Sequence, residues 1–429
     1  MSGAVVVPNE APPAPATPGL SPAHTRRATW VLIALRAGYA YNWFTIGPAF
    51  TAIGASFSVG EAEWGLLLAA FLGAAGLLQV PAGLLARRYG TRPIALGGAG
   101  LLAVASIASG FAPNFATLLA FRGLAGAGAA LFFSPAIGLV GSLYPEGKRG
   151  LPVGTFSSAF SGGAALGVVV SAIVVGPLGW QADLALGGLG LLLLTGVAYL
   201  LVPRRAGAPP RARPAGGRFP DALRLRSLWA IGIAFVGLEG ASFATGQFLV
   251  PYGEGLGWSA AVAGGVAMAF VLPSLFGGPV GGVLAESYAN RRAQFVVATG
   301  VGAALVAAIP WVGIGVIVVL GAAFSFGYGF VYAVMYVLPN YLPRLDADDI
   351  PIGIGLFNSI QLAGGAVVNW GFGVWAAVFG YPWAWSLLAI AVVLPLAALA
   401  YVPATGRARR GGAHPRDAAS AGPRPGPAP

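Results

Sequence analysis

A short basic turn between two long apolar runs occurs twice in the chain, and it constrains the fold more than any other feature. The first copy covers residues 81–93 and the second covers 282–292. Each flanking run is long enough to cross a bilayer as a helix, which takes about 20 apolar residues. Two such turns in corresponding positions predict a duplicated membrane protein with many crossings.

The first turn resembles the loop between helices 2 and 3 of the major facilitator superfamily of secondary transporters, which reads roughly G-x-L-A-D-R-x-G-R-K. The matching residues are Gly83, Leu85, Ala86, Arg88, Gly90 and Arg92. Arg87 stands where the family usually has Asp, whereas the second copy keeps an acid there, Glu286. The resemblance implies an all-α integral membrane protein in which twelve transmembrane helices form two pseudo-symmetric six-helix bundles.

Composition supports the same fold class. Hydrophobic residues make up 57% of the chain and charged residues only 9%, whereas about a quarter of a soluble globule is charged. Twelve apolar runs lie between polar breaks. We expect helices near 29–54, 62–85, 93–112, 115–142, 151–177, 182–202, 228–252, 259–285, 293–311, 314–341, 350–379 and 382–402.

Further repeats support the duplication. Pro152-Val153-Gly154 recurs as Pro351-Ile352-Gly353, at the same offset of 199 residues that separates Gly83 from Gly282. We therefore expect bundles at 29–202 and 227–403, joined by a basic cytoplasmic linker at 203–226. The Pro- and Ala-rich ends, 1–28 and 404–429, are expected to be disordered cytoplasmic tails.

The distribution of positive charge predicts the orientation. The formal net charge is +11, and 22 of the 24 Lys and Arg residues fall in the tails and the even-numbered loops. By the positive-inside rule this places both termini in the cytoplasm of a cell whose inner membrane holds the protein. It also explains the positive charge without nucleic acid as a partner. The odd-numbered loops are expected to hold acids: Glu61, Glu63, Asp183 and Glu254.

The sequence contains none of the catalytic or nucleotide-binding motifs that are typical of soluble enzymes. The chain has no Cys, and both of its His residues lie in the tails. It also lacks a phosphate-binding loop and a nucleophile elbow. We therefore expect no enzyme activity, no cofactor and no metal site.

Two charged residues inside predicted helices are candidates for proton coupling, because charge in the bilayer is costly and usually functional. Glu239 lies near the middle of the seventh helix, where burial favours the neutral form of a carboxyl, or else it is a structural acid that never exchanges its proton. Arg122 begins a segment that resembles the family's R-x-x-x-G-x-G pattern, whose arginine is associated with proton coupling. It can also bind an anionic substrate, or simply bind carbonyls of neighbouring helices.

Polar residues on several helices are candidates for substrate binding. Tyr328, Tyr332 and Tyr336 recur at every fourth position and therefore share one helix face. Arg36 either lines a cavity or extends to the headgroups, and ordinary interhelical hydrogen bonds explain the polar residues nearly as well. Ser157, Ser158 and Ser161 supply a further polar face. The candidate set is Arg36, Tyr39, Asn42, Arg122, Tyr328, Tyr332, Tyr336, Asn358 and Gln361.

The family resemblance implies that the loop between helices 2 and 3 meets the start of helix 11 and closes the cytoplasmic side. Arg87 would then face Asp348 and Asp349, while Glu286 would face Lys148 and Arg149, so that the first pair has exchanged its signs. Unpaired topology-setting charges are the alternative. The predicted gate consists of Gly83, Arg87, Arg88, Gly90, Arg92, Asp348, Asp349, Glu286, Lys148 and Arg149.

These features predict a secondary transporter that works by alternating access, with a small organic anion such as a carboxylate taken up together with a proton. Its expected partners are a small-molecule solute, protons and the lipid bilayer, and the expected state is a monomer. Proton-coupled efflux of amphipathic compounds is one alternative. A membrane sensor that uses the same fold without transport is the other.

Overall fold

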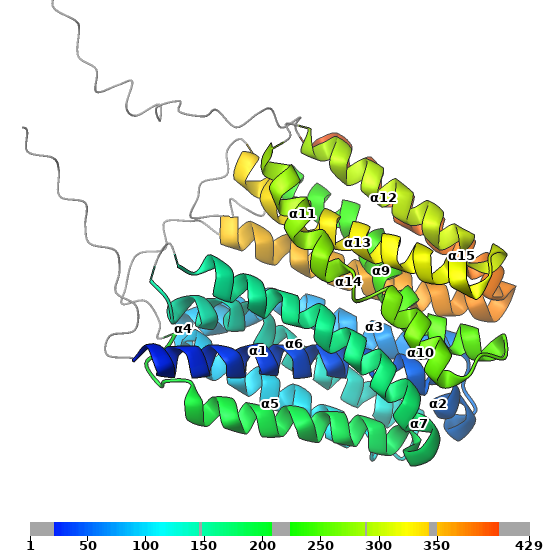
Figure 1. The fold of residues 1–429 in the computed structure, drawn as a ribbon, viewed down its shortest axis with the longest axis horizontal. Helices are drawn as coiled ribbons and strands as arrows, with labels where there is room; N and C mark the ends of the chain where they lie inside the picture. The colour runs from blue at the N-terminus through cyan, green and yellow to red at the C-terminus, as the bar shows by residue number, and fades with distance from the viewer. Residues whose placement is uncertain (1–20, 146–147, 208–223, 288–289, 343–349, 403–429) are drawn as a thin grey trace, which may run out of the picture.

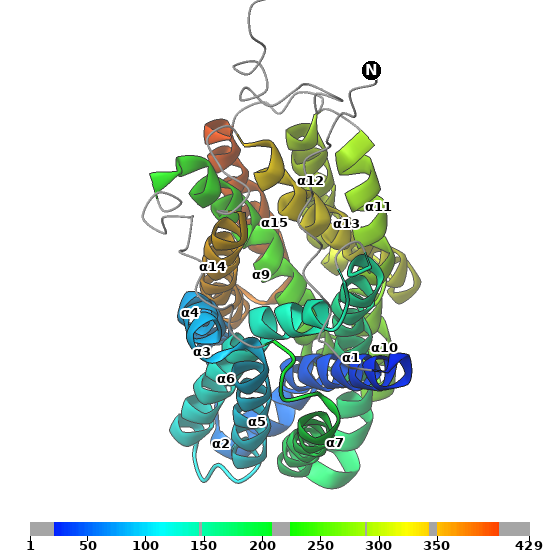
Figure 2. The same ribbon diagram turned by 90° about the vertical axis from the view of Figure 1, so that its left-hand side faces the viewer.

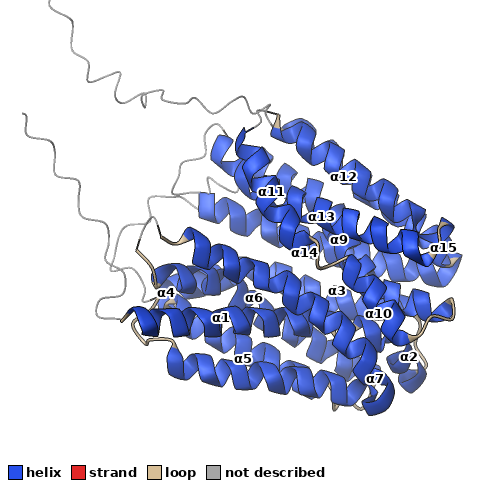
Figure 3. Cartoon of the chain, in the orientation of Figure 1, coloured by secondary structure: helices blue, strands red, loops and turns tan. Residues whose placement is uncertain are grey.

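The structure is a computed structural model, and it describes residues 21–145, 148–207, 224–287, 290–342 and 350–402. Within these ranges the chain is built from helices and short turns, with no strand (Figure 3). The helices lie roughly along one direction (Figure 1), and the view turned by 90° shows α1–α7 below most of α9–α15 (Figure 2). The predicted all-α fold is confirmed.

The first half contains α1 (Pro22–Phe44), η1 (Gly47–Ala49), α2 (Phe50–Phe57), α3 (Glu61–Leu77), α4 (Gln79–Tyr89), α5 (Thr91–Ser109), α6 (Phe115–Ser142) and α7 (Gly150–Leu201). The second half contains α9 (Arg226–Gly255), α10 (Ala260–Ala269), α11 (Ser274–Ser287), α12 (Arg291–Ala308), η2 (Ile309–Trp311), α13 (Ile314–Val337), η3 (Leu338–Tyr341), α14 (Ile350–Phe379), α15 (Tyr381–Val393) and η4 (Leu394–Tyr401).

In the described part of the chain, nine helices are long and apolar enough to cross a membrane, or ten if α3 and α4 count as one bent span. One of the nine, α7, has 52 residues, and at 1.5 Å per residue it is far too long for one crossing. Gly179 breaks it, with φ at 81°, and the two arms fold back on each other (Figure 1). The two arms agree with the helices predicted at 151–177 and 182–202. The full count of twelve stays a prediction, because α1 does not meet the same criteria.

Three predicted helices are interrupted, and each interruption has the same cause. The helices α1, α3 and α10 end at Phe44, Leu77 and Ala269, four residues before Pro48, Pro81 and Pro273. A proline ring clashes with the carbonyl four residues earlier and supplies no N–H to bond it, which costs about 3 kcal/mol or more inside a helix. The predicted continuous helices at 29–54, 62–85 and 259–285 are therefore corrected to broken ones, and α3 meets α4 at 43°.

The two ends of the molecule differ in charge. We call the end that carries Arg87, Arg88, Lys148, Arg205 and Arg292 the basic end, and the end that carries Glu61, Glu63 and Glu254 the acidic end. The basic end lies at the left of Figure 1 and the turn of α7 at the right. Asp183 was expected in a loop of the acidic end, but it lies inside α7 and is 1% exposed.

At the acidic end the halves are packed without space for larger side chains. A Cβ on Gly65 would lie 2.8 Å from the carbonyl oxygen of Asn369, and one on Gly373 would collide with the carbonyl oxygen of Glu61. The backbones of α3 and α14 therefore touch across the two halves, as small residues permit in membranes. Thr51 adds a cross-half hydrogen bond of 2.9 Å to Oε2 of Glu254.

Candidate substrate cavity

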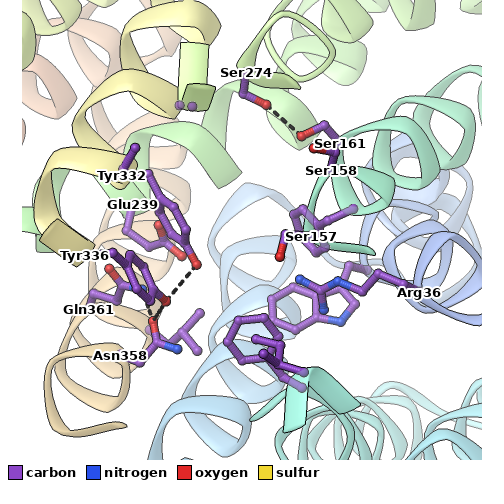
Figure 4. A pocket seen from close by; sticks show the side chains of 18 of the residues that line it. Arg36, Ser157, Ser158, Ser161, Glu239, Ser274, Tyr332, Tyr336, Asn358 and Gln361 are labelled. Carbon is purple, nitrogen blue, oxygen red and sulfur yellow. Dashed lines mark hydrogen bonds between the residues drawn. The ribbon is translucent and has the colours of Figure 1, made fainter. Parts of the chain in front are cut away.

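A cavity of about 480 Å³ lies between the two halves. Its walls come from α1, α3, α4, α6 and α7 on one side and from α9, α11, α13 and α14 on the other (Figure 4). Rings close it toward the acidic end, where Trp43 lies 5.5 Å from Phe243, and Phe44 stacks on Phe243 at 5.3 Å. Toward the basic end the lining continues to Val153, Tyr336 and Ile354, near the ends of their helices. Such a space is of the size that holds small organic ligands.

Arg36 is the cation of this cavity in the described part of the chain. Its guanidinium carbon lies 4.6–4.8 Å from the ring centres of Phe133, Tyr39 and Phe160, and a fourth ring, Phe156, lies at 5.6 Å. Rings hold a cation through their negative faces. Nε and Nη1 form no hydrogen bond with any described residue, so the guanidinium keeps unused donors. In this conformation Arg36 therefore lines the cavity between the halves.

Glu239 lines the opposite wall and is 3% exposed. The hydroxyl of Tyr328 donates to its Oε2 at 2.8 Å. Tyr332 lies close enough to interact electrostatically with both Glu239 and Arg36. The one acid and the one cation that line the cavity therefore face the same space from different halves (Figure 4).

The predicted face of three tyrosines is present on α13 and turns toward the cavity. The hydroxyls of Tyr332 and Tyr336 are 3.0 Å apart, and Tyr336 donates to Oδ1 of Asn358 at 2.8 Å. Gln361 donates to the same oxygen. These bonds join α13 to α14 and connect Tyr332, Tyr336, Asn358 and Gln361 in one network (Figure 4).

The serines of α7 lie where the two halves meet. Ser157, Ser158 and Ser161 all line the cavity. The hydroxyl of Ser161 is 2.9 Å from that of Ser274, the first residue of α11. The break before α11 thus presents a polar group to the other half (Figure 4).

Two candidate residues lie behind the cavity wall. Asn42 donates from Nδ2 to the carbonyl oxygens of Gly38 and Gly187, at 2.9 and 3.0 Å, which joins α1 to α7. Arg122 is fully buried, with its guanidinium 4.6 Å from the ring centre of Phe71. None of its three nitrogens forms a hydrogen bond with a described residue. In this conformation neither side chain is among those that line the cavity.

The predicted gate is described only in part. Gly90 has φ at 94° where the chain turns from α4 into α5, a conformation that favours glycine. Arg92 donates to the carbonyl oxygens of Val202 and Tyr199 at 3.0 and 2.7 Å, so it joins α5 to the end of α7 within one half. Gly83 has open space around it. Among the other basic candidates, Arg87, Arg88 and Lys148 are exposed, and Arg149 is partly buried.

The acidic partners of the gate cannot be placed. Asp348 and Asp349 lie outside the described residues, and so does the side chain of Glu286. Both charge pairs therefore stay predictions.

Sequence reasoning missed several lining residues. Gln79 follows the break of α3 and is 3% exposed at the cavity; a lone amide in an apolar run was a usable signal. The rings of Phe133, Phe156, Phe160 and Phe243 gave no such signal, because aromatic residues are common throughout apolar helices.

Comparisons with known proteins agree on one family. The model of the Major Facilitator Superfamily matches residues 32–368. By structure, the chain is similar to a bacterial homolog of the human lysosomal transporter Spinster in an inward-facing and unoccupied conformation. The TM-score is 0.72 at 15% identity, and the match covers 90% of this chain and 98% of that one.

Three relatives are named for different activities. The "Tetracenomycin C resistance and export protein" of Streptomyces glaucescens is 29% identical over 161 residues, 37% of this chain and 30% of its own length. "Probable nitrate/nitrite transporter NarK2" of Mycobacterium tuberculosis is 28% identical over 283 residues, 65% of this chain and 70% of its own. The "4-hydroxybenzoate transporter PcaK" of Pseudomonas aeruginosa is 32% identical over 161 residues, 38% and 35%. The chain thus spans about a third of the length of the first and last of these.

Proposed function

Because the chain belongs to the major facilitator superfamily, we propose that it is a proton-coupled secondary transporter that takes up a small organic anion such as a carboxylate. The observation that carries the proposal is the pair of opposite charges, Arg36 and Glu239, on the two walls of one cavity. Each half contributes one of them, so relative movement of the halves changes the surroundings of both.

Arg36 supports an anionic solute. A guanidinium forms charge-assisted hydrogen bonds with a carboxylate, and this one has unused donors at Nε and Nη1. Burial makes an uncompensated cation costly, which favours an incoming anion over an incoming cation. Two relatives are named as transporters of anions, one of nitrate/nitrite and one of 4-hydroxybenzoate.

Glu239 supports proton coupling. A buried carboxyl that accepts from a hydroxyl and faces a cation across the cavity has two accessible states, one neutral and one ionised. When Glu239 is neutral, Arg36 leaves the cavity net positive and ready for an anion. When Glu239 is ionised, it competes with that anion for the positive field. Solute and proton are then favoured together, which is the requirement for symport.

The packing supports alternating access. The halves touch through backbone at the acidic end, whereas the cavity lining extends toward the basic end. With both termini in the cytoplasm of a cell membrane, as the positive-inside rule favours, the cavity faces inward in this structure. Such halves rock around a central site, and one chain is sufficient as a monomer.

Efflux of amphipathic compounds is a second candidate. It is favoured by the rings that line much of the cavity, Trp43, Phe133, Phe160 and Phe243, and by the tetracenomycin export protein among the relatives. In uptake by symport the proton moves in the same direction as the solute, whereas in proton-coupled efflux it moves in the opposite direction.

The test is internal pH in dye-loaded proteoliposomes that contain the purified protein. Lactate, succinate, 4-hydroxybenzoate and nitrate are added separately, and tetraphenylphosphonium serves as an amphipathic cation. We expect carboxylate-driven acidification that is lost in Glu239→Gln and kept in Glu254→Gln, an acid of the same helix outside the cavity.

Alkalinisation by tetraphenylphosphonium instead would support efflux. An unchanged internal pH with every compound would favour a sensor without transport. In the Glu239→Gln variant, exchange of labelled for unlabelled carboxylate should persist, because exchange needs no net proton release.

A further inference from the structure

Asp183 is a buried acid that the proposed function does not use. It lies in the second arm of α7, four residues after the break at Gly179, and it is 1% exposed. It does not line the cavity between the halves. The side chain is instead enclosed within the first half, about one helical turn from the acidic end.

The carboxyl has no bonding partner of ordinary geometry. Neither Oδ1 nor Oδ2 forms a hydrogen bond with any described residue. The hydroxyl of Ser171, in the first arm of α7, adjoins the carboxyl, but its Oγ is likewise buried without a hydrogen bond. Among the described residues, Ser171 has the one hydroxyl that adjoins the buried carboxyl, and a buried carboxylate without a cation beside it is strongly unfavourable. The closed surroundings therefore favour the neutral form of Asp183.

The neighbouring elements supply no cation. Tyr41 of α1 faces Asp183 and Ser171, and its ring packs on Gly187, where a Cβ would lie 2.9 Å from Cε1. The segments η1, α2 and α10 contain no titratable residue. In α5 the one such residue is Arg92, which binds the carbonyls at the far end of α7. Arg122 of α6 packs on Phe71, and Arg36 of α1 lies in its ring cage.

The surroundings of Asp183 depend on the contact between the halves. Ala172, next to Ser171 in α7, packs on Gly264 of α10, where an added Cβ would lie 2.7 Å from that of Ala172. This contact belongs to the closed acidic end. If α10 leaves α7 when that end opens, the face of α7 next to Ser171 loses its cover, which would give water a path to the carboxyl.

We propose that Asp183, with Ser171 and Tyr41, forms a second proton-binding site, which holds its proton while the acidic end is closed and exchanges it with the solution on that side when the end opens. The inference rests on the proposed proton coupling, but it assigns a group outside the cavity. One proton then binds at Glu239 and one at Asp183 in each cycle.

The test is the proton-to-solute ratio, taken from the pH gradient that just stops net flux against a known solute gradient. The probe is 4-hydroxybenzoate, or lactate if the former is not transported. We expect Asp183→Asn to lower the ratio by one proton per solute and Asp183→Glu to keep it. Thr195→Val, a buried polar residue of the same arm that bonds only Leu191, is the matched control and should keep the ratio.

An unchanged ratio in a stable Asp183→Asn protein overturns the second site while leaving symport intact. If the wild-type protein shows no solute-driven proton movement, the proposed function is overturned instead. A second readout needs neither transport nor a stable Asp183→Asn protein. Infrared spectra of Glu239→Gln at neutral pH should show the band of a protonated buried carboxyl. The absence of this band would by itself overturn the inference.

Discussion

The hydroxyl of Tyr328 donates a 2.8 Å hydrogen bond to Oε2 of Glu239, and this bond joins α13 to α9 at the wall of the cavity. Tyr328 also packs its ring 5.7 Å from that of Phe235 on α9. The carboxyl that we assign to proton coupling is therefore held by a donor whose own position is fixed by packing. Any movement of α13 relative to α9 changes the stability of the ionised carboxylate.

Replacing Tyr328 with Phe removes this donor and keeps the ring. Because the lost bond is worth about 1 kcal/mol, we expect net carboxylate uptake to fall about fivefold, while solute exchange changes little. The measurement is labelled uptake and exchange in the same proteoliposomes. Tyr89→Phe, on an exposed residue of α4, is the control; equal losses in uptake and exchange would contradict a role in proton release.

Arg36 is the expected anchor for the anionic group of the solute. Arg36→Met keeps the apolar stem and removes the charge, so we expect carboxylate binding to weaken by about 2 kcal/mol, or roughly thirtyfold. Arg36→Lys should recover only part of this, because an ammonium lacks the planar donors of a guanidinium. Binding by calorimetry checks both variants against Arg205→Met, an exposed arginine of the basic end.

Gly373 lets α14 touch α3 at the acidic end. In Gly373→Ala the added methyl meets the carbonyl oxygen of Glu61, so the closed arrangement becomes less stable than the open one. The chain has no Cys, so a single Ser157→Cys in the cavity reports access from the basic end. We expect slower labelling in Gly373→Ala and normal labelling in Gly355→Ala, a glycine of the same helix with open space around it.

The predicted gate can be tested by exchanging charges. Arg87→Asp should impair uptake through repulsion from Asp349, and Asp349→Arg added to it should restore uptake. The coupling should weaken at high ionic strength, because exposed charges are screened. Independent losses in the two single variants, without rescue in the double variant, would argue against the pair.

Much of the helical arrangement could be predicted from the apolar runs. The helix expected at 115–142 is α6, Phe115–Ser142, and that expected at 350–379 is α14, Ile350–Phe379. The breaks within the helices were harder to predict. Pro135, Pro251 and Pro279 lie inside continuous helices, so a proline alone does not say whether a helix breaks or merely accommodates it. Packing against neighbours decides between the two.

Some features of the cavity could likewise be predicted from the sequence, and others could not. The tyrosine face of α13 follows from spacing along one helix, and so it was predictable. The ring cage of Arg36 combines α1, α6 and α7, and only tertiary structure brings those rings together. Asp183 was assigned to a loop because an acid near a helix boundary normally faces water, whereas here the helix hairpin encloses it.

The two walls of the cavity differ in stiffness. Hydrogen bonds connect the polar groups of the second half, from Tyr332 through Tyr336 to Asn358 and Gln361, so one replacement disturbs several partners. Around Arg36, the hydroxyl of Tyr39 donates to the carbonyl oxygen of Ala129 at 3.4 Å, whereas Phe133, Phe156 and Phe160 have no polar side-chain group and can be exchanged for other apolar side chains at lower cost. We therefore expect replacement of these three rings to reshape the cavity with less loss of stability than replacement of the bonded groups on the second wall.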